Sequence, residues 1–143
     1  MNILVLDDEK EIADLVEVYL KNEDYTVYKC YTAKDAIECI KTKVLDMAIL
    51  DVMVQETSGF EICKMIREKG YCFPVMMLTA KIQDEDKITG LTLGADDYMT
   101  KPFNPLELVA RVKSALRRYT KYNGAEDRSE EIQIGGLVIA PQK

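Results

Sequence analysis

Short apolar runs alternate with stretches of helical spacing along the first 119 residues. Two of the runs, Met47–Asp51 and Val75–Ala80, are almost wholly apolar, as in strands that are buried on both faces of a parallel sheet. A shorter apolar or alternating pattern marks three further strands. In chain order, the predicted strands are Asn2–Leu6, Tyr25–Cys30, Met47–Asp51, Val75–Ala80 and Gly94–Thr100.

Between the runs, apolar residues recur every three or four positions, which predicts a helix after each strand. Thr32 and Asn104 are suitable N-cap residues. The fourth helix, about Asp84–Leu93, has an apolar stripe of only Ile88 and Leu91, so we expect it to be loosely packed. The apolar face of the first helix is Ile12, Leu15, Val16, Tyr19 and Leu20, and that of the second is Ala33, Ala36, Ile37 and Ile40. The third helix ends near Gly70 and has the apolar face Phe60, Cys63, Met65 and Ile66. The fifth helix ends at Arg117–Tyr119 and has the apolar face Leu106, Leu108, Val109, Val112 and Leu116.

Strict alternation of strands and helices predicts an α/β fold with parallel strands and helices on both faces. The expected layout is a (βα)5 doubly wound, five-stranded parallel sheet in the order 2-1-3-4-5. In that order the crevice lies at the carboxyl ends of the first and third strands. Asp7, Asp8 and Asp51 should therefore lie together at one edge of the sheet.

The length of 143 residues suits one domain with an additional segment. We expect a domain over residues 1–119 and a polar linker over 120–131, where the hydrophobic pattern stops. Residues 132–143 read as strand, turn and strand. Because two strands are not stable alone in water, we expect this segment to begin a second domain that is truncated here.

Composition excludes several classes of function. A net charge of −6 argues against this chain alone binding nucleic acid. No apolar run approaches the roughly 18 residues of a membrane span, and no basic leader precedes the first strand, so we expect a cytoplasmic protein without membrane contact. The four cysteines lack a C-x-x-C pair and should be reduced, structural thiols. The absence of histidine excludes Ser-His or Cys-His catalysis and His-ligated metals within this chain.

Three acids at adjacent strand ends repel one another, and a hard divalent cation removes that repulsion. Oxygen ligands with open positions suit Mg²⁺, beside which Asp51 is a candidate nucleophile toward phosphorus. Thr79 can offer a hydroxyl and Lys101 an ammonium to phosphoryl oxygens. Each residue alone has an ordinary structural explanation, such as a helix N-cap or a solvent-facing lysine. Their joint placement at the carboxyl ends of four strands favours a phosphoryl site.

These motifs resemble the receiver domain of two-component response regulators, over about residues 1–118, which implies a flavodoxin-like fold. The resemblance rests on Asp7-Asp8, Asp51, Thr79-Ala80, Gly90–Tyr98 and Lys101-Pro102-Phe103. Gly-Ala-Asp-Asp-Tyr-Met-Thr-Lys-Pro-Phe and Arg117-Arg118 are similar to the OmpR/PhoB class of transcription regulators.

The resemblance implies that Asp51 accepts a phosphoryl group from a sensor histidine kinase, while Asp7, Asp8 and the backbone carbonyl of Met53 join it in holding Mg²⁺. It also implies that Thr79 and Lys101 bind the phosphoryl oxygens and that the Lys101-Pro102 bond is cis. Such a domain is a regulatory phosphoacceptor, which catalyses only its own phosphorylation and slow dephosphorylation. Gln55 departs from the family, which usually has proline there, and this puts the rigidity of the loop after Asp51 in doubt.

The resemblance further implies a switch of Thr79 and Tyr98, and a homodimer of phosphorylated copies through the fourth helix, the fifth strand and the fifth helix. DNA would be bound only through a winged-helix domain that residues 132–143 begin. Two alternatives are a stand-alone receiver acting as an adaptor and a phosphatase of the haloacid-dehalogenase type, which needs an acid where Met53 stands. The expected dimer residues are Lys87, Asp96, Asp97, Glu107, Arg111 and Arg118.

Overall fold

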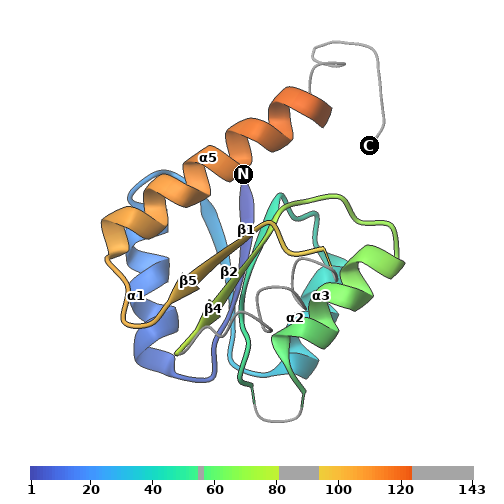
Figure 1. The fold of residues 1–143 in the computed structure, drawn as a ribbon, viewed down its shortest axis with the longest axis horizontal. Coiled ribbons are helices and arrows are strands. Elements are labelled where there is room, and N and C mark those ends of the chain that lie inside the picture. The colour runs from blue at the N-terminus through green and yellow to red at the C-terminus, as the bar shows by residue number, and fades with distance from the viewer. Residues whose placement is uncertain (55–56, 81–93, 124–143) are drawn as a thin grey trace. The chain divides into compact units, whose positions relative to one another are not determined.

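Five parallel strands form one sheet in the order β2-β1-β3-β4-β5, which confirms the predicted topology (Figure 1). The computed structural model describes residues 1–54, 57–80 and 94–123. The predicted helix at Asp84–Leu93, Lys87, Gln55 and residues 132–143 lie outside them. The strands are β1 Asn2–Leu6, β2 Thr26–Cys30, β3 Met47–Asp51, β4 Val75–Thr79 and β5 Asp97–Thr100.

Helices lie on both sides of this sheet: α1 on one side, and α2 and α3 on the other (Figure 1). The expected caps are present, because Thr32 Oγ1 accepts a hydrogen bond from the Asp35 amide and Asn104 Oδ1 accepts one from the Leu106 amide. None of the described helices is long and apolar enough to cross a membrane. The helices are α1 Lys10–Lys21, α2 Ala33–Thr42, α3 Gly59–Glu68 and α5 Pro105–Asn123.

The chain divides into two compact units, Met1–Val109 and Ala110–Lys143. In the second unit the described residues are the continuation of α5, which ends at Asn123 and not at the predicted Tyr119. Neither glycine nor proline interrupts the sequence between these positions, so no local signal stops the helix earlier.

The core of the first unit is built on β3 and β4, in which every residue is buried. Two predicted helix-face residues are exposed instead: the exposed fractions of Leu15 and Leu106 are 38% and 68%. In α1 the buried positions are Ala13, Val16 and Leu20, so the small Ala13 belongs to the buried face and Leu15 lies at its edge.

Strand β5 begins three residues later than the sequence predicted, at Asp97. Gly94 has a φ of +101°, which a strand does not accommodate. Before the strand begins, Asp96 forms two hydrogen bonds with Val75, which together close a ring. The Asp96 amide donates to the Val75 carbonyl, and the Asp96 carboxylate accepts from the Val75 amide, both at 2.8 Å. The beginning of β4 is thereby bound to the residues that lead into β5.

The first residue of α3, Gly59, lies directly against the end of β3. A Cβ atom at Gly59 would lie 2.4 Å from the Asp51 carbonyl oxygen and 2.9 Å from Met77 Cε. Only the methionine can yield, so Gly59→Ala should lower the free energy of unfolding by about 1–3 kcal/mol, the usual cost of overpacking. Urea denaturation measures this change, with the exposed Lys64→Ala in the same helix as a control. Equal stability of the two variants would contradict the contact.

Candidate functional site

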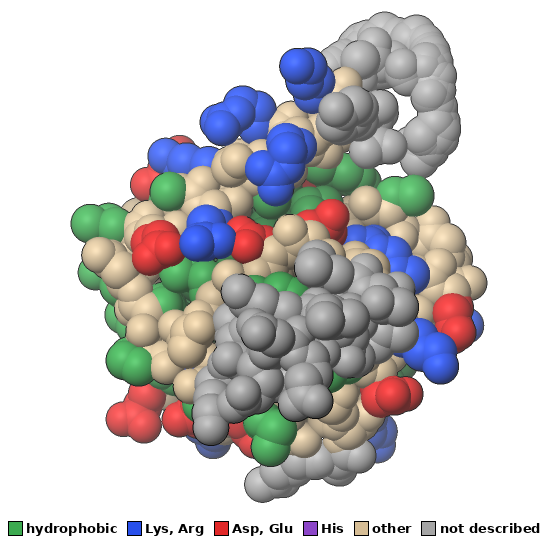
Figure 2. All heavy atoms as spheres, in the orientation of Figure 1, with side chains coloured by type: hydrophobic (Ala, Val, Ile, Leu, Met, Phe, Trp, Pro, Cys, Tyr) green, Lys and Arg blue, Asp and Glu red, His purple; other side chains and the backbone are tan. Residues whose placement is uncertain are grey.

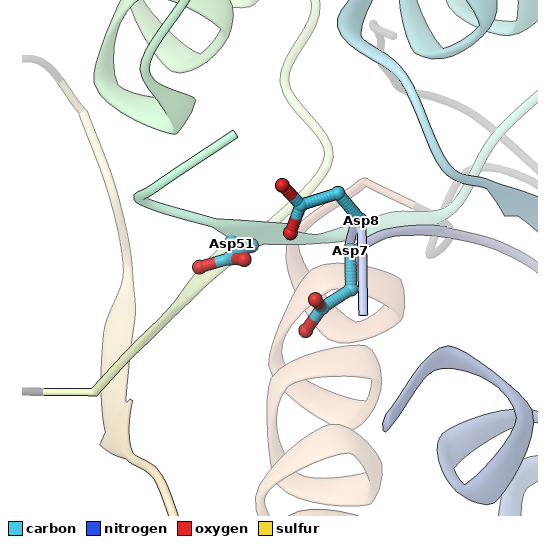
Figure 3. Close-up of side chains that lie close together, drawn as sticks. All are labelled: Asp7, Asp8 and Asp51. Carbon is cyan, nitrogen blue, oxygen red and sulfur yellow. The ribbon is translucent and has the colours of Figure 1, made fainter. Parts of the chain in front are cut away.

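Three carboxylates meet at the carboxyl edge of the sheet. Asp51 ends β3, and Asp7 and Asp8 follow β1, whose Leu6 is paired with Leu50 of β3. One oxygen from each carboxylate lies within 4.8 Å of the others, and Figure 3 shows the three groups converging. Asp7 is completely buried and Asp51 is 3% exposed. The structure thus brings together the acids that the sequence placed at this edge.

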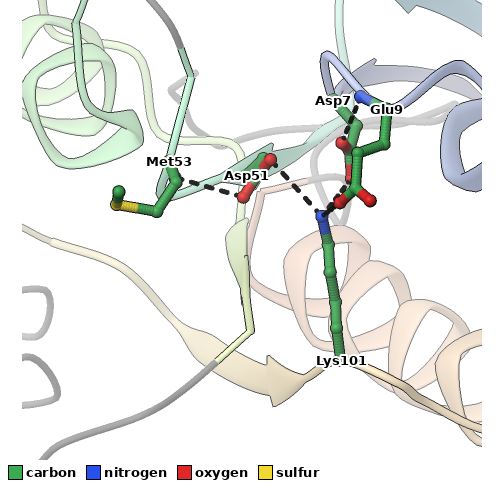
Figure 4. A network of polar contacts seen from close by, with 5 residues as sticks. All are labelled: Asp7, Glu9, Asp51, Met53 and Lys101. Atoms are coloured by element: carbon green, nitrogen blue, oxygen red, sulfur yellow. Dashed lines mark hydrogen bonds and ion pairs between the residues drawn. The ribbon is translucent and has the colours of Figure 1, made fainter.

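Lys101 supplies the positive charge of the cluster. Its Nζ lies 2.7 Å from Asp7 Oδ2, 2.9 Å from Glu9 Oε1 and 3.3 Å from Asp51 Oδ2. Figure 4 shows the ammonium between Asp51 on one side and Asp7 and Glu9 on the other. The other oxygen of Asp51 accepts a hydrogen bond of 3.1 Å from the Met53 amide. One ammonium is therefore shared by three carboxylates.

The protonation of Asp51 reflects its surroundings. Burial and then the charge of Asp7 raise the pKa of Asp51 from 3.8 to about 6, against the lowering by the Met53 amide and by Lys101. Burial disfavours the charged form of Lys101, but contacts with Asp7 and Glu9 outweigh it and raise the pKa of this lysine. At neutral pH, Asp51 is mainly ionised, as a nucleophile must be, and Lys101 is fully charged.

The remaining predicted residues of the site follow the same edge. Thr79 is buried at the end of β4, where it pairs in register with Thr100, and its carbonyl accepts a hydrogen bond of 2.7 Å from the Lys101 amide. The Lys101-Pro102 peptide bond is cis, as the resemblance implied. Tyr98 is half-buried in the middle of β5. The backbone thus fixes Thr79 and Lys101 next to each other.

Sequence reasoning missed Glu9 as a partner of Lys101. In the sequence, Glu9 is only one of several acids that precede or begin α1, where negative charge interacts favourably with the helix dipole. Nothing in the local sequence pairs Glu9 with a lysine 92 positions away. The signal available was indirect: glutamate is a poor N-cap residue, and Glu9 occupies the N-cap of α1 without a side-chain capping bond.

The donor set fits a hard divalent cation. The candidate side-chain ligands are all carboxylate oxygens, and Mg²⁺ prefers oxygen ligands. Asp7 Oδ2 is buried and receives no geometrically sound hydrogen bond from the described residues, although it forms an ion pair with Lys101. A buried carboxylate oxygen that lacks a hydrogen-bond donor can still coordinate a metal ion. Asp7, Asp8 and Asp51 would hold the ion.

Comparison with known proteins identifies the family. The model of the response regulator receiver domain matches residues 3–113. The chain belongs to this family. Receiver domains bind Mg²⁺ at an aspartate cluster of this kind, are phosphorylated by sensor histidine kinases and often dimerise. The cluster of Asp7, Asp8 and Asp51 thus lies within a receiver domain of the two-component response regulator family.

The receiver domain is similar to two curated regulatory proteins. It is 60% identical to regulatory protein VanR of Enterococcus faecium over 96% of this chain and 59% of VanR. It is 55% identical to regulatory protein VanRc of Enterococcus gallinarum over 96% of this chain and 60% of VanRc. The chain therefore spans about six-tenths of the length of these curated relatives.

Among solved structures, the OmpR/PhoB homologue DrrB of Thermotoga maritima resembles this receiver domain with a TM-score of 0.76 and 40% identity, over 82% of this chain and 52% of DrrB. A CheY-like receiver domain from Methanospirillum hungatei gives a TM-score of 0.82 and 27% identity, over 85% of this chain and 98% of the other. The expected resemblance to the OmpR/PhoB class is confirmed, and the chain is in addition similar to VanR.

The described residues that were expected at a dimer interface have partners within the chain. Asp96, 44% of whose side chain is exposed, forms an ion pair of 2.9 Å with Arg67 of α3. Asp97 Oδ1 accepts from the Tyr98 amide, and Arg118 donates to Ser114 Oγ at 2.8 Å. Basic side chains gather over α5 in Figure 2. The described residues named for the interface lie just before β5, on β5 and on α5; they are Asp96, Asp97, Glu107, Arg111 and Arg118.

Arg67 connects the end of α3 to the residues that precede β4 and β5. Its guanidinium donates to the carbonyl groups of Tyr71, Phe73 and Gly94 at 2.8–3.0 Å, besides the ion pair with Asp96. Arg67→Met should lower the free energy of unfolding by about 2 kcal/mol, because these carbonyl groups lose a charged donor. Chemical denaturation tests this, with Lys34→Met on α2 as the control. A change no larger than that of the control would contradict the inferred role.

Proposed function

We propose that Asp51 accepts a phosphoryl group from a phosphohistidine of a sensor kinase. An oxygen of Asp51 attacks phosphorus, an O–P bond forms, and the P–N bond to histidine breaks, leaving the kinase imidazole to take up a proton. The observation that carries this proposal is the position of Asp51, a buried, mainly ionised carboxylate beside two further acids and an ammonium.

The surrounding residues have separate tasks in this proposal. Asp7, Asp8, Asp51 and the Met53 carbonyl would hold Mg²⁺, which when bound would neutralise charge on the phosphoryl oxygens. Lys101 would bind one phosphoryl oxygen and Thr79 another. Their backbone connection supports this role, because it keeps the two groups at a fixed separation at the ends of β4 and β5.

The output would follow from the new charge. A phosphoryl group of about −2 charge attracts Thr79, and Tyr98 would then turn inward on the β4 side. The altered face, which includes β5 and α5, would dimerise through Lys87, Asp96, Asp97, Glu107, Arg111 and Arg118. Transcription would be controlled by a winged-helix DNA-binding domain that residues 132–143 begin, beyond a linker that starts after α5 and not at the predicted residue 120. The greater length of VanR and VanRc supports this assignment.

Labelling of the chain with acetyl phosphate tests the proposal. With Mg²⁺, intact mass spectrometry should show the addition of one phosphoryl group, and chelation of the metal should prevent it. Hydroxylamine should remove the label, because it cleaves acyl phosphates and not phosphate esters of serine or threonine. Peptide mapping should place the label on residues 47–53. A label that resists hydroxylamine would move the acceptor to a hydroxyl group and overturn the proposal.

A further inference from the structure

The side chain of Glu9 does not cap the helix at whose N-terminus it stands. It is the N-cap of α1, yet its carboxylate makes no capping hydrogen bond. The Glu9 amide donates to Asp7 Oδ1 at 2.9 Å, and the Glu9 carbonyl accepts from the amides of Ile12 and Ala13 at 3.0 and 3.1 Å. The backbone of Glu9 is therefore held on both sides, while its side chain reaches across the site to Lys101.

The contact with Glu9 affects how the Lys101 ammonium is shared among the three carboxylates. Lys101 Nζ is closer to Asp7 and Glu9, at 2.7 and 2.9 Å, than to Asp51, at 3.3 Å. An ammonium has three donors. Figure 4 shows the Lys101 ammonium in contact with three carboxylates, so a phosphoryl oxygen on Asp51 would compete with them for it. Glu9 is the most exposed of the three, with 62% of its side chain exposed.

We propose that Glu9 is a positioning residue that draws the Lys101 ammonium away from Asp51 and thereby slows attachment of the phosphoryl group. This inference rests on the proposed function. Two effects act in the same direction. The contact competes with the phosphoryl oxygens for Lys101, and the Glu9 charge repels an anionic phosphoryl donor as it approaches. Asp7 serves as a metal ligand in the proposed function, but Glu9 has no such task.

Glu9→Gln removes the charge and keeps the length of the side chain. With acetyl phosphate and saturating Mg²⁺, its rate of labelling at Asp51 should be about 3 to 10 times that of the wild type. The matched control is Glu11→Gln, which removes the same charge from an exposed position in the first turn of α1. That control should remain within about twofold of the wild type.

Glu9→Asp separates the contact from the charge. The shorter side chain keeps the charge but cannot reach Lys101 from the same backbone position. If Glu9 acts by holding the ammonium, Glu9→Asp should be labelled nearly as fast as Glu9→Gln. If Glu9→Asp behaves like the wild type while Glu9→Gln is fast, charge alone is responsible and the positioning role is wrong. Equal or slower rates in both variants would also overturn it.

The same series distinguishes this inference from the proposed function. If every chain is labelled at Asp51 at one rate, only the role of Glu9 fails. If no chain is labelled at Asp51, the phosphoacceptor proposal itself fails, and with it the role of Glu9. Thermal denaturation of each variant without acetyl phosphate provides an independent readout. A purely structural role for Glu9 would shift the melting temperature of Glu9→Gln without changing its labelling rate.

Discussion

Asp51→Asn should abolish labelling by acetyl phosphate and also stabilise the metal-free protein by about 2 kcal/mol at pH 7. The first effect follows because an amide cannot form the acyl phosphate. The second follows because the wild-type protein holds an ionised carboxylate that is buried beside Asp7. Asparagine removes that charge while keeping the size of the side chain. Intact mass spectrometry measures the first effect and urea denaturation in a chelator measures the second.

The gain in stability should depend on pH in a defined direction. Folding raises the pKa of Asp51 from 3.8 to about 6, so the folded protein holds this proton more tightly than the unfolded chain does. The stabilising contribution of the protonated form is complete below pH 3.8 and is lost as the pH rises through 6. The advantage of Asp51→Asn over the wild type should therefore grow across this window and remain constant above it.

The exposed Asp35 on α2 provides the control for both effects. Asp35→Asn should be labelled normally, and its free energy of unfolding should change by less than about 0.5 kcal/mol. Saturating Mg²⁺ should reduce the advantage of Asp51→Asn, because the ion binds the wild-type carboxylate and favours the folded state. An Asp51→Asn protein that is less stable than the wild type at pH 7 would mean that Lys101 outweighs burial and Asp7.

Lys101→Met should have the opposite effect on stability. Removal of the ammonium leaves Asp7, Glu9 and Asp51 without their shared cation. Breaking a buried ion pair in this way costs about 3–5 kcal/mol. Because Glu9 is exposed to water, we expect a loss of about 3 kcal/mol in the metal-free protein at pH 8, measured by urea denaturation. The loss should shrink below pH 6, where Asp51 takes up a proton.

A second lysine of the same chain controls for the loss of an ion pair as such. Lys29 is also paired with two acids, at 2.7 and 2.9 Å from Asp14 and Glu17, but that cluster lies on the surface. Lys29→Met should therefore lower the free energy of unfolding far less than Lys101→Met does. Mg²⁺ should restore stability to Lys101→Met and not to Lys29→Met. Equal losses in the two variants, without rescue by Mg²⁺, would show that the carboxylate cluster needs no cation.

The sequence was sufficient to predict the sheet order and the position of Asp7, Asp8 and Asp51. Both depend on regular rules: apolar runs mark buried strands, and parallel strands bring their carboxyl ends to one edge. Local composition could not show that Glu9 reaches Lys101, because that contact depends on the path of two distant loops. The same limit applies to Arg67 and Asp96, 29 residues apart, whose ion pair depends on the positive φ of Gly94 and the turn after it.

The burial of two helix residues was predicted wrongly for a different reason. Leu15 and Leu106 were assigned to apolar faces because hydrophobicity alone does not fix the rotation of a helix about its axis. The position of the neighbouring strands decides whether a leucine at the edge of the stripe is covered. Ala13 contributes little to a hydrophobic pattern and is completely buried.

The hydrogen bonds at the two ends of β5 restrict how this strand can respond to a new group on Asp51. At its beginning, Asp96 and Val75 form a closed ring of two hydrogen bonds. At its end, the Lys101 amide is bonded to the Thr79 carbonyl. Sliding of β5 along β4 would break both attachments at once. A rearrangement at Tyr98, between them, should therefore take place by rotation about side-chain torsions while the ladder of the sheet stays in register.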